Sequence, residues 1–276
     1  MNYRHSFHAG NSADVVKHSL LIALVRALQQ KPGALTLIDT HAGCGLYDLS
    51  SEEAQRTGEA TQGVLRAFDD PNPLLDDYRA AVQAVNAGAE PRFYPGSPRF
   101  LAQLLRPQDF LILNEKHPED AYALRGAMRG TSAAVHQRDA YEFWLAMLPP
   151  RTARGVMLVD PPYEQIDERA RITATLAAAH RKWAHGVTVV WYPLKDRTTH
   201  VRWTQQLRKL GIPKLLRVEH WLYDSDQPGI YNGAGLYIVN PPYAFTQALP
   251  PLLEALRAAL APEGHRGEIT TNWLGD

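Results

Sequence analysis

An apolar run at residues 156–159 ends in the sequence Asp160-Pro161-Pro162-Tyr163. A carboxylate and a backbone carbonyl held at a strand end can together accept both N–H bonds of an aromatic amino group. The lone pair of such a nitrogen is normally delocalised into its ring, so the nitrogen attacks a methyl sulfonium poorly until these acceptors localise the lone pair. Asp160 supplies the carboxylate and Pro161 the carbonyl. Each proline fixes φ, so the turn holds both acceptors in advance.

This chemistry predicts methylation of the exocyclic N6 of an adenine, with Asp160, Pro161 and Tyr163 as catalytic residues. The ring of Tyr163 offers a face on which a base can stack, worth about 1–3 kcal/mol. Taking a base out of its stack costs roughly a few kcal/mol. Stacking on the ring of Tyr163 would offset part of that cost. Positioning alone can supply about 7–11 kcal/mol of the barrier. We therefore expect S-adenosylmethionine as the cofactor and no metal.

A second copy of the motif, Asn240-Pro241-Pro242-Tyr243, also follows an apolar run. The apolar run that it follows comes after six other candidate strands and near the end of the sequence, where a last sheet strand belongs. Asp160 instead follows the fourth candidate strand, which neighbours the first in the usual order of such sheets. We therefore assign catalysis to Asp160 and a structural role to the second copy.

Three further acidic residues, Asp39, Glu115 and Asp139, follow apolar runs. Asp39 opens a turn whose glycines, Gly43 and Gly45, allow close approach of the backbone to a ligand. Glu115 suits the two hydroxyls of a ribose, and Asp139 suits an adenine amino group. The turn lacks the third glycine and the helix start of a dinucleotide fingerprint, which disfavours a nicotinamide cofactor. The three acids together favour another cofactor that contains adenosine.

The elements that must position these residues alternate between strand and helix. This pattern predicts an α/β fold with a mostly parallel seven-stranded sheet. Residues 11–30 predict a helix, capped by Asn11 or Ser12 and stopped by Lys31-Pro32-Gly33. Strands are expected at 35–39, 110–114, 133–136, 156–160, 187–192, 215–222 and 236–239. Such sheets bind ligands at the carboxyl ends of their strands.

The segment of residues 47–92 is too long for a simple loop between a strand and a helix. It contains helical patterning at residues 65–68 and 74–85. We therefore expect one methyltransferase domain over residues 1–276, with a small helical insertion at about residues 47–92.

Composition describes an ordinary globular enzyme: 276 residues, 45 % hydrophobic, with 29 basic and 29 acidic residues. The balanced charge argues against binding nucleic acid by bulk electrostatics, so any such site must be local and shaped. The single cysteine, Cys44, favours a reducing cytoplasm and is expected to fill the glycine turn rather than act as a nucleophile. We expect no signal peptide, no membrane span and no zinc site among the histidines.

With these residues in place, the sequence resembles the RlmJ family of 23S ribosomal RNA adenine-N6 methyltransferases over nearly its full length. The matching segments besides the Asp160 motif are 3–11 (YRHSFHAGN), 13–15 (ADV), 17–18 (KH), 39–43 (DTHAG), 56–59 (RTGE), 94–98 (YPGSP), 191–193 (WYP) and 239–242 (VNPP). The opening segment is the most distinctive of these. Cys44 and Ala140 depart mildly from the family pattern, because other small residues are expected there.

The resemblance implies a Rossmann-like fold with a helical insertion between the first strand and its helix. It implies methylation of 23S ribosomal RNA, naked or in an early assembly intermediate, at the adenine named for position 2030. We expect a cytoplasmic monomer without an obligate protein partner. The expected cofactor-binding residues are His18, His41, Gly43, Ser97, Glu115, Asp139, Ala140 and Asp160. The expected substrate-binding residues are Tyr3, His5, Lys17 and Tyr163. Ser97 followed by Pro98 also reads as a helix cap whose helix start could receive the cofactor carboxylate.

Three alternatives stay open at this point. DNA adenine-N6 methyltransferases share the Asp-Pro-Pro-Tyr signature, although no helix-turn-helix reader is evident here. A glutamine methyltransferase acting on a release factor would use Asn-Pro-Pro-Tyr, which would make Asn240 catalytic. A non-catalytic module that binds adenosine is the third possibility.

Overall fold

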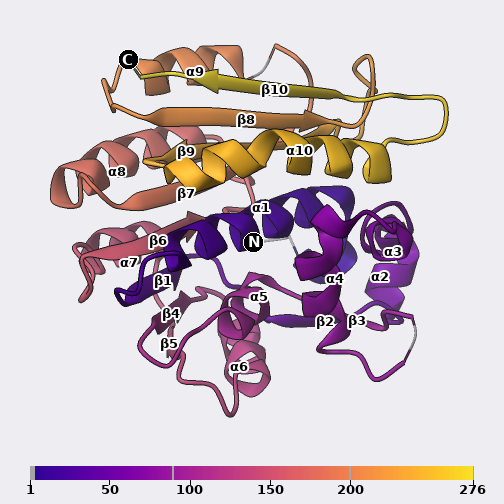
Figure 1. The fold of residues 1–276 in the computed structure, drawn as a ribbon, viewed down its shortest axis with the longest axis horizontal. Coiled ribbons are helices and arrows are strands. Elements are labelled where there is room, and N and C mark those ends of the chain that lie inside the picture. The colour runs from indigo at the N-terminus through magenta and orange to yellow at the C-terminus, as the bar shows by residue number, and fades with distance from the viewer. Residues whose placement is uncertain (1–3, 89, 199, 276) are drawn as a thin grey trace.

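The protein was analysed as a computed structural model, which describes residues 4–88, 90–198 and 200–275. Tyr3, expected to contact substrate, lies outside these residues. The main sheet contains β1 (Leu35–Asp39), β4 (Phe110–Asn114), β5 (Ala134–His136), β6 (Arg154–Val159), β7 (Val187–Leu194), β8 (Leu215–Trp221), β9 (Gly233–Val239) and β10 (Glu268–Trp273). Their order across the sheet is β10-β8-β9-β7-β6-β1-β4-β5 (Figure 1).

The strands from β7 to β5 are parallel, and β9, β8 and β10 extend the sheet with antiparallel pairs. Each of the seven expected strands is present, and β6 lies beside β1 as expected. The sheet has an eighth strand because β10 pairs with β8 at the edge. The sequence of β10, Glu-Ile-Thr-Thr-Asn-Trp, is mostly polar and largely exposed, so it carries little of the apolar signal that marks a buried strand.

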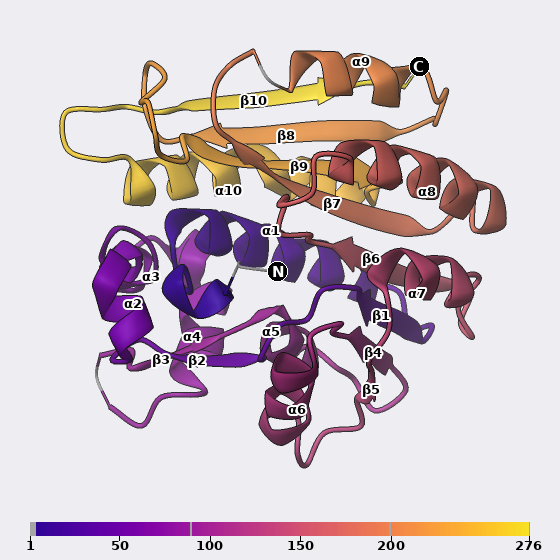
Figure 2. The same cartoon turned by 180° about the vertical axis from the view of Figure 1, so that it is seen from behind.

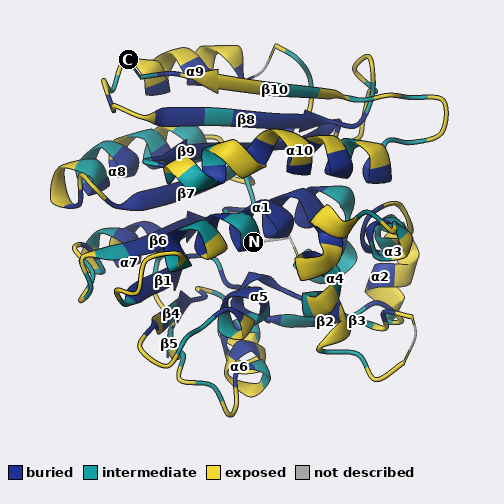
Figure 3. Ribbon diagram, in the orientation of Figure 1, coloured by how far each residue is buried: buried dark blue, intermediate teal, exposed yellow. Residues whose placement is uncertain are grey.

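Helices cover both faces of the sheet, as Figure 2 shows from behind. The helices are α1 (Ser12–Gln29), α2 (Glu52–Thr57), α3 (Val64–Asp69), α4 (Asp76–Gln83), α5 (Ser97–Gln103), α6 (Pro118–Ala127), α7 (Ala140–Ala146), α8 (Glu168–Lys182), α9 (Val201–Arg208) and α10 (Tyr243–Leu260). Successive residues of β1 face opposite sides: Leu37 packs in the cluster with α1 and α10, and Ile38 in the cluster with α7, α8 and α9. The central strands are therefore buried along their length (Figure 3).

The segment between β1 and α5 contains α2, α3 and α4. A small antiparallel pair, β2 (Leu46–Asp48) with β3 (Phe93–Pro95), lies at its base. Its buried side chains, which include Val64, Tyr78 and Val82, belong to the same apolar cluster as α1 and α10. These helices thus pack against the main core instead of forming a core of their own. None of the described helices is both long and apolar enough to cross a membrane.

The start of α3 contacts the backbone that leads into α1. The amide of Val64 donates to the carbonyl of Gly10 over 2.7 Å. A Cβ at Gly63 would lie 2.1 Å from that carbonyl oxygen and 2.4 Å from the carbonyl carbon of Asn11. Asn11 is the cap of α1, and its side chain accepts from the amide of Asp14. Only glycine at residue 63 allows this close approach, which fixes where α1 begins.

We predict that Gly63→Ala lowers the free energy of unfolding by about 1–3 kcal/mol, because the added methyl group must push two backbone segments apart. Chemical denaturation measures the change. Gly126→Ala is the matched control, because a Cβ there meets nothing within 4 Å and the position is helical. Alanine at residue 126 should stabilise by about 0.4–1 kcal/mol. Equal effects of the two substitutions would contradict the packing argument.

Candidate active site

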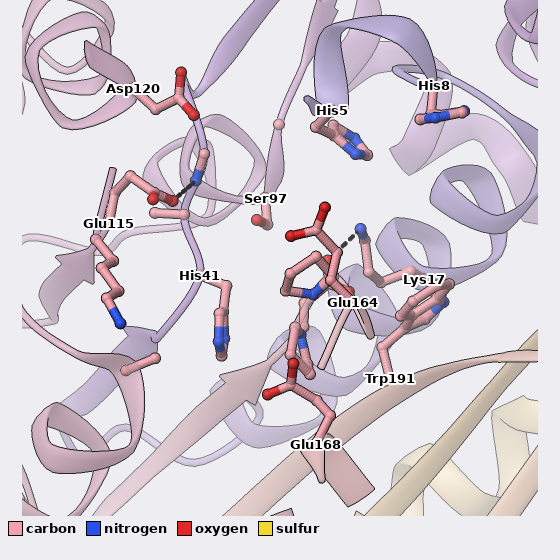
Figure 4. Close-up of a pocket in the computed structure, with 18 of the residues that line it drawn as sticks. His5, His8, Lys17, His41, Ser97, Glu115, Asp120, Glu164, Glu168 and Trp191 are labelled. Atoms are coloured by element: carbon pink, nitrogen blue, oxygen red, sulfur yellow. Dashed lines mark hydrogen bonds and ion pairs between the residues drawn. The ribbon is translucent and has the colours of Figure 1, made fainter. Parts of the chain in front are cut away.

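The acids expected at strand ends do meet at one edge of the sheet, where Glu115, Asp139 and Asp160 line a cavity of about 570 Å³. Figure 4 shows this cavity with Glu115 on its wall. Parallel strands have their carboxyl ends at the same edge, so Asp39, Glu115, Asp139 and Asp160 converge although they are far apart in sequence. Of the expected site residues, those that line the cavity are His5, Lys17, His18, His41, Gly43, Ser97, Glu115, Asp139, Ala140, Asp160 and Pro161. Tyr163 is not among them.

Asp160 is held by a network of buried charges. Its Oδ2 lies 2.6 Å from the Nζ of Lys17, and the same Nζ lies 2.8 Å from Oδ1 of Asp14. The other oxygen of Asp14 accepts from the amide of Gly10 and lies 2.9 Å from Nε2 of His5. The side chains of Lys17 and Asp14 are only 5 % and 2 % exposed. The network therefore joins the N-terminal segment and α1 to the carboxyl end of β6.

The buried groups of this network stabilise one another as charges. Burial alone would lower the pKa of Lys17, but the carboxylates of Asp14 and Asp160 outweigh it and raise that pKa. Burial alone would raise the pKa of Asp14, yet His5 and Lys17 lower it well below its usual range. Lys17 is therefore a cation and Asp14 an anion at neutral pH.

Asp39 is fully buried beneath the cavity. Its Oδ2 accepts from the hydroxyl of Ser97 over 2.6 Å, and its Oδ1 accepts from the amide of His41 over 3.1 Å. Burial raises the pKa of Asp39 to about 7, against the opposing effect of these two hydrogen bonds. The expectation that Ser97 caps its helix is wrong: Gly96 is the cap residue, and Ser97 is the first residue of α5. Its hydroxyl is directed to Asp39 instead.

His18 presents an unpartnered donor to the cavity. Its Nδ1 lies 2.7 Å from the hydroxyl of Tyr94, which in turn accepts from the hydroxyl of Tyr78. The Tyr94 proton is thus directed to Nδ1, and the imidazole proton sits on Nε2. Burial lowers the pKa of His18 well below its usual range, so the ring is neutral. Nε2 is buried and has no hydrogen-bond partner among the described residues.

His41 presents a hydrogen-bond acceptor to the cavity, whereas His18 presents a donor. The hydroxyl of Thr40 donates to the carbonyl of Leu158, so its oxygen accepts from Nδ1 of His41 over 2.8 Å. Burial lowers the pKa of His41 to about 4. The neutral ring therefore leaves Nε2 as an acceptor on the cavity wall.

Glu115 and Asp139 complete the wall opposite Lys17. Glu115 accepts from the amides of Gly43 (2.9 Å) and His117 (2.8 Å), which orients its carboxyl group. Asp139 caps α7 by accepting from the amide of Tyr141. Its other oxygen lies 3.0 Å from the Nζ of Lys116. Asp139 is thus engaged already, and an incoming amino group would have to displace the exposed lysine.

Tyr163 lies beneath the cavity floor. Its φ of 54° turns the chain, its hydroxyl donates to the carbonyl of Trp191 over 2.6 Å, and its ring meets Trp203 edge-on. The stacking face predicted for this residue is therefore not presented to the cavity in this structure. Trp191 lines the cavity instead, and Lys17 Nζ lies 5.8 Å from the centre of its ring.

The N-terminal segment is fastened beside the cavity, which His5 and His8 line. Nδ1 of His8 and the side-chain amide of Asn11 contact the two oxygens of Glu59, at 2.8 and 3.0 Å. Arg4 pairs with Glu119 of α6 over 2.7 Å. The segment that leads to Lys17 thus depends on the helices between β1 and α5.

Cys44 is not an activated nucleophile. Burial and the neighbouring Asp120 raise the pKa of the thiol to about 12. Its Sγ donates to Oδ1 of Asp120 over 3.2 Å. The thiol therefore stays protonated and fills the glycine turn, as expected. Among the residues that the structure describes, no group of three or more His, Cys, Asp or Glu side chains is arranged to hold a metal ion.

The second copy of the motif lies at the opposite edge of the sheet. β9 is antiparallel to β7, and Val239 pairs with Thr188 near the start of that strand. Asn240 therefore lies near the amino ends of the parallel strands. Its side-chain amide donates to the carbonyls of Ala184 and Gly186. This geometry supports a structural role for Asn240.

Sequence reasoning missed several residues of the cavity wall: Asp14, Trp191, Tyr231, Glu168 and Arg171. Asp14 and Trp191 lie in two of the distinctive segments, 13–15 and 191–193, which was the available signal. Glu168, which accepts from the Tyr141 hydroxyl, and Arg171 belong to α8 and carry no motif. Tyr231 comes from the loop between β8 and β9.

We predict that Asn240→Ala lowers the free energy of unfolding by about 0.5–1.5 kcal/mol, because the carbonyls of Ala184 and Gly186 lose their donor. The residue also has a φ of 50°, which asparagine tolerates better than alanine. Urea unfolding measures the loss, and binding of the expected cofactor should be unchanged. Loss of cofactor binding without loss of stability would contradict the structural assignment.

Asp39 should make stability depend on pH. Its folded pKa of about 7 lies above the unfolded value, so the unfolded chain loses this proton first as the pH rises. The contribution of Asp39 is therefore complete below about pH 4 and declines as the pH rises towards 7. We predict that the free energy of unfolding of the wild-type protein falls by roughly a few kcal/mol across this pH window. The free energy of unfolding of Asp39→Asn should not show this fall. Identical pH profiles of the two proteins in urea unfolding would refute this.

The chain was compared with known proteins. The family model described as "Ribosomal RNA large subunit methyltransferase D, RlmJ" matches residues 32–275. The chain is similar to proteins named "Ribosomal RNA large subunit methyltransferase J" from Escherichia coli and Haemophilus influenzae. Its identity to them is 38 % and 36 %, over 99 % of each chain.

Solved structures agree with this relationship. The structure of protein LPL1258 from Legionella pneumophila superposes with a TM-score of 0.86 at 32 % identity, covering 96 % of this chain and 98 % of that one. A probable spermidine synthase from Corynebacterium glutamicum, at 12 % identity and a TM-score of 0.50, covers 92 % of this chain and 73 % of its own, and shares only the fold. The chain therefore belongs to the large-subunit ribosomal RNA methyltransferase family RlmJ.

Proposed function

We propose that the protein transfers a methyl group from S-adenosylmethionine to N6 of one adenine in 23S ribosomal RNA, the adenine at position 2030 by family resemblance. The observation that carries the proposal is the place of Asp160. It stands at the carboxyl end of β6, in the same cavity as the residues at the ends of β1 and β4. The names of the two bacterial relatives support a large-subunit RNA substrate.

The cavity offers complementary groups for each part of S-adenosylmethionine. The unpartnered Nε2–H of His18 suits the carboxylate, and the acceptor Nε2 of His41 suits the ammonium group. The oriented carboxyl group of Glu115 suits the ribose hydroxyls, and the wall at Asp139 and Ala140 suits the adenine. Ser97 and Gly43 complete the set. Bound there, this cofactor supplies an electrophilic methyl group.

Lys17 would orient the carboxylate of Asp160 while contacting only one of its two oxygens. It holds Oδ2 of Asp160, so Oδ1 can accept one N–H of the target amino group while the carbonyl of Pro161 accepts the other. The attacking nitrogen forms its bond to the methyl carbon as the carbon–sulfur bond breaks, and then loses one proton. Asp160 is placed to accept that proton and pass it towards solvent.

The target base would enter from the side of the N-terminal segment. His5 lines the entrance, and Tyr3 is assigned to the base by the resemblance alone. Trp191 offers an aromatic face within the cavity, and Tyr163 supports the turn of the prolines from below. The single cysteine and the ribosomal substrate support a cytoplasmic location of the protein. We further propose that the enzyme is a monomer that uses no metal.

Substitution of Asp160 tests this function. Asp160→Asn and Asp160→Ala should each lower kcat on a 23S RNA transcript by at least about a hundredfold, because a preorganised acceptor is lost. Binding of S-adenosylmethionine should persist in Asp160→Asn, whose amide oxygen can still contact Lys17, and the matched variant of the second motif, Asn240→Ala, should retain turnover.

The same assay separates the alternatives. Retained turnover in the Asp160 variants would contradict the assigned chemistry. Transfer to duplex DNA but not to RNA would replace the RNA substrate by DNA. If the wild type binds the cofactor but methylates no substrate, the remaining reading is a non-catalytic module that binds adenosine.

A further inference from the structure

The edge of the sheet opposite the active site has an unusual distribution of charge. On the side of that edge formed by β6, β7, β8 and β9, the connecting segments are residues 147–153 before β6, 181–186 before β7, 208–214 before β8 and 240–243 after β9. They contain no acidic residue and six basic ones: Arg151, Arg181, Lys182, Arg208, Lys209 and Lys214. We call these six residues the basic edge. Because the whole chain carries 29 bases and 29 acids, this local excess is an asymmetry of the surface and not a property of the composition.

Hydrogen bonds join these loops into one surface. Nε2 of His185 bonds to the carbonyl of Ala153, which ties the loop before β7 to the loop before β6. The side chain of Asn240 donates to Ala184 and Gly186, and its amide donates to the carbonyl of Lys214. The second copy of the proline motif is therefore the centre of the surface, where it fixes three loops.

The charges of the basic edge are exposed and unneutralised. Each of the six side chains belongs to an exposed residue, and none forms an ion pair with any described residue. Lys182 bonds to a backbone carbonyl and Arg151 lies over the ring of Phe110. Their positive charges thus remain available to a partner. Clusters of this kind bind the phosphates of nucleic acid by releasing counterions.

Two large aromatic side chains accompany the charges. Tyr243 is 77 % exposed and Trp273 is 50 % exposed, and both line a hollow of about 380 Å³ together with Lys214. Exposed aromatic faces beside lysines are the combination that binds single-stranded or splayed nucleotides, the ring stacking on a base while the cation meets the phosphate. An acidic protein surface would not require the two rings.

From these observations we infer that the basic edge, with Tyr243 and Trp273, binds a second segment of the RNA substrate, remote from the target adenine. The inference rests on the proposed function for the identity of the RNA. β6 has six residues between the basic edge and Asp160, a span of about 20 Å at about 3.3 Å per residue. An RNA that reaches both surfaces must therefore extend around the molecule, which a large folded RNA can do and a minimal hairpin cannot.

The test compares two RNAs: a long 23S transcript and a hairpin trimmed to the few base pairs around the target. The variants are Lys209→Gln with Lys214→Gln, and separately Tyr243→Ala. Each should raise KM for the long transcript by about tenfold and leave kcat unchanged. Neither should change KM for the hairpin. The lysine pair should also reduce the slope of log affinity against log salt for the long transcript by about two.

The control removes the same number of charges elsewhere, with Arg56→Gln and Arg202→Gln, which are exposed on α2 and at the start of α9 and form no ion pair with any described residue. It should leave KM for both RNAs unchanged. Equal KM values of wild type and variants for the long transcript would overturn the inference. An equal loss on the hairpin, or the same loss in the control, would also overturn it.

Binding of RNA without turnover separates this inference from the proposed function. If the wild type methylates neither RNA, the proposed function fails, but a salt-dependent loss of long-transcript binding in the lysine pair would still support the basic edge. If the variants bind naked RNA normally and lose activity only on an assembling ribosomal particle, the partner is a protein of that particle, and the inference is overturned.

Discussion

The buried ion pair between Lys17 and Asp160 is the interaction on which the site depends. A cation almost fully removed from water is stable here only because Asp14 and Asp160 both contact it. Asp14 in turn fixes Gly10 and His5, so the entry to α1, the N-terminal segment and the end of β6 are held by one set of charges. The close packing of Gly63 against that entry extends the constraint to α3 and the helices between β1 and α5.

The direction of the strands decides what each motif can do. Asp160 follows a parallel strand and reaches the cavity, whereas Asn240 follows an antiparallel strand and reaches the opposite edge. Two similar proline motifs thus lie at opposite ends of the sheet, one at the cavity and one among the loops of the basic edge. Their sequences differ only at the first residue, and the direction of the preceding strand decides which edge each one reaches.

The sequence predicted the strands and the convergence of the acids, because buried parallel strands are continuous apolar runs and their polar successors must share an edge. It did not predict β10, whose pattern is polar, or the true partner of Ser97, because Asp39 contacts it only in the folded chain. The position of Tyr163 depends on its left-handed backbone, and the roles of Asp14 and Trp191 depend on contacts between distant segments. Such contacts carry no local signal.

The most direct test of the account is a map of N6-methyladenine in the 23S ribosomal RNA of a deletion strain and its parent, with the deletion complemented by either wild-type or Asp160→Ala protein. The account predicts that one methylated adenine is absent from the deletion strain, returns with the wild-type gene and stays absent with the Asp160 variant. Identical methylation in the deletion strain and its parent would contradict the assigned substrate. Restoration by the Asp160 variant would contradict the assigned chemistry.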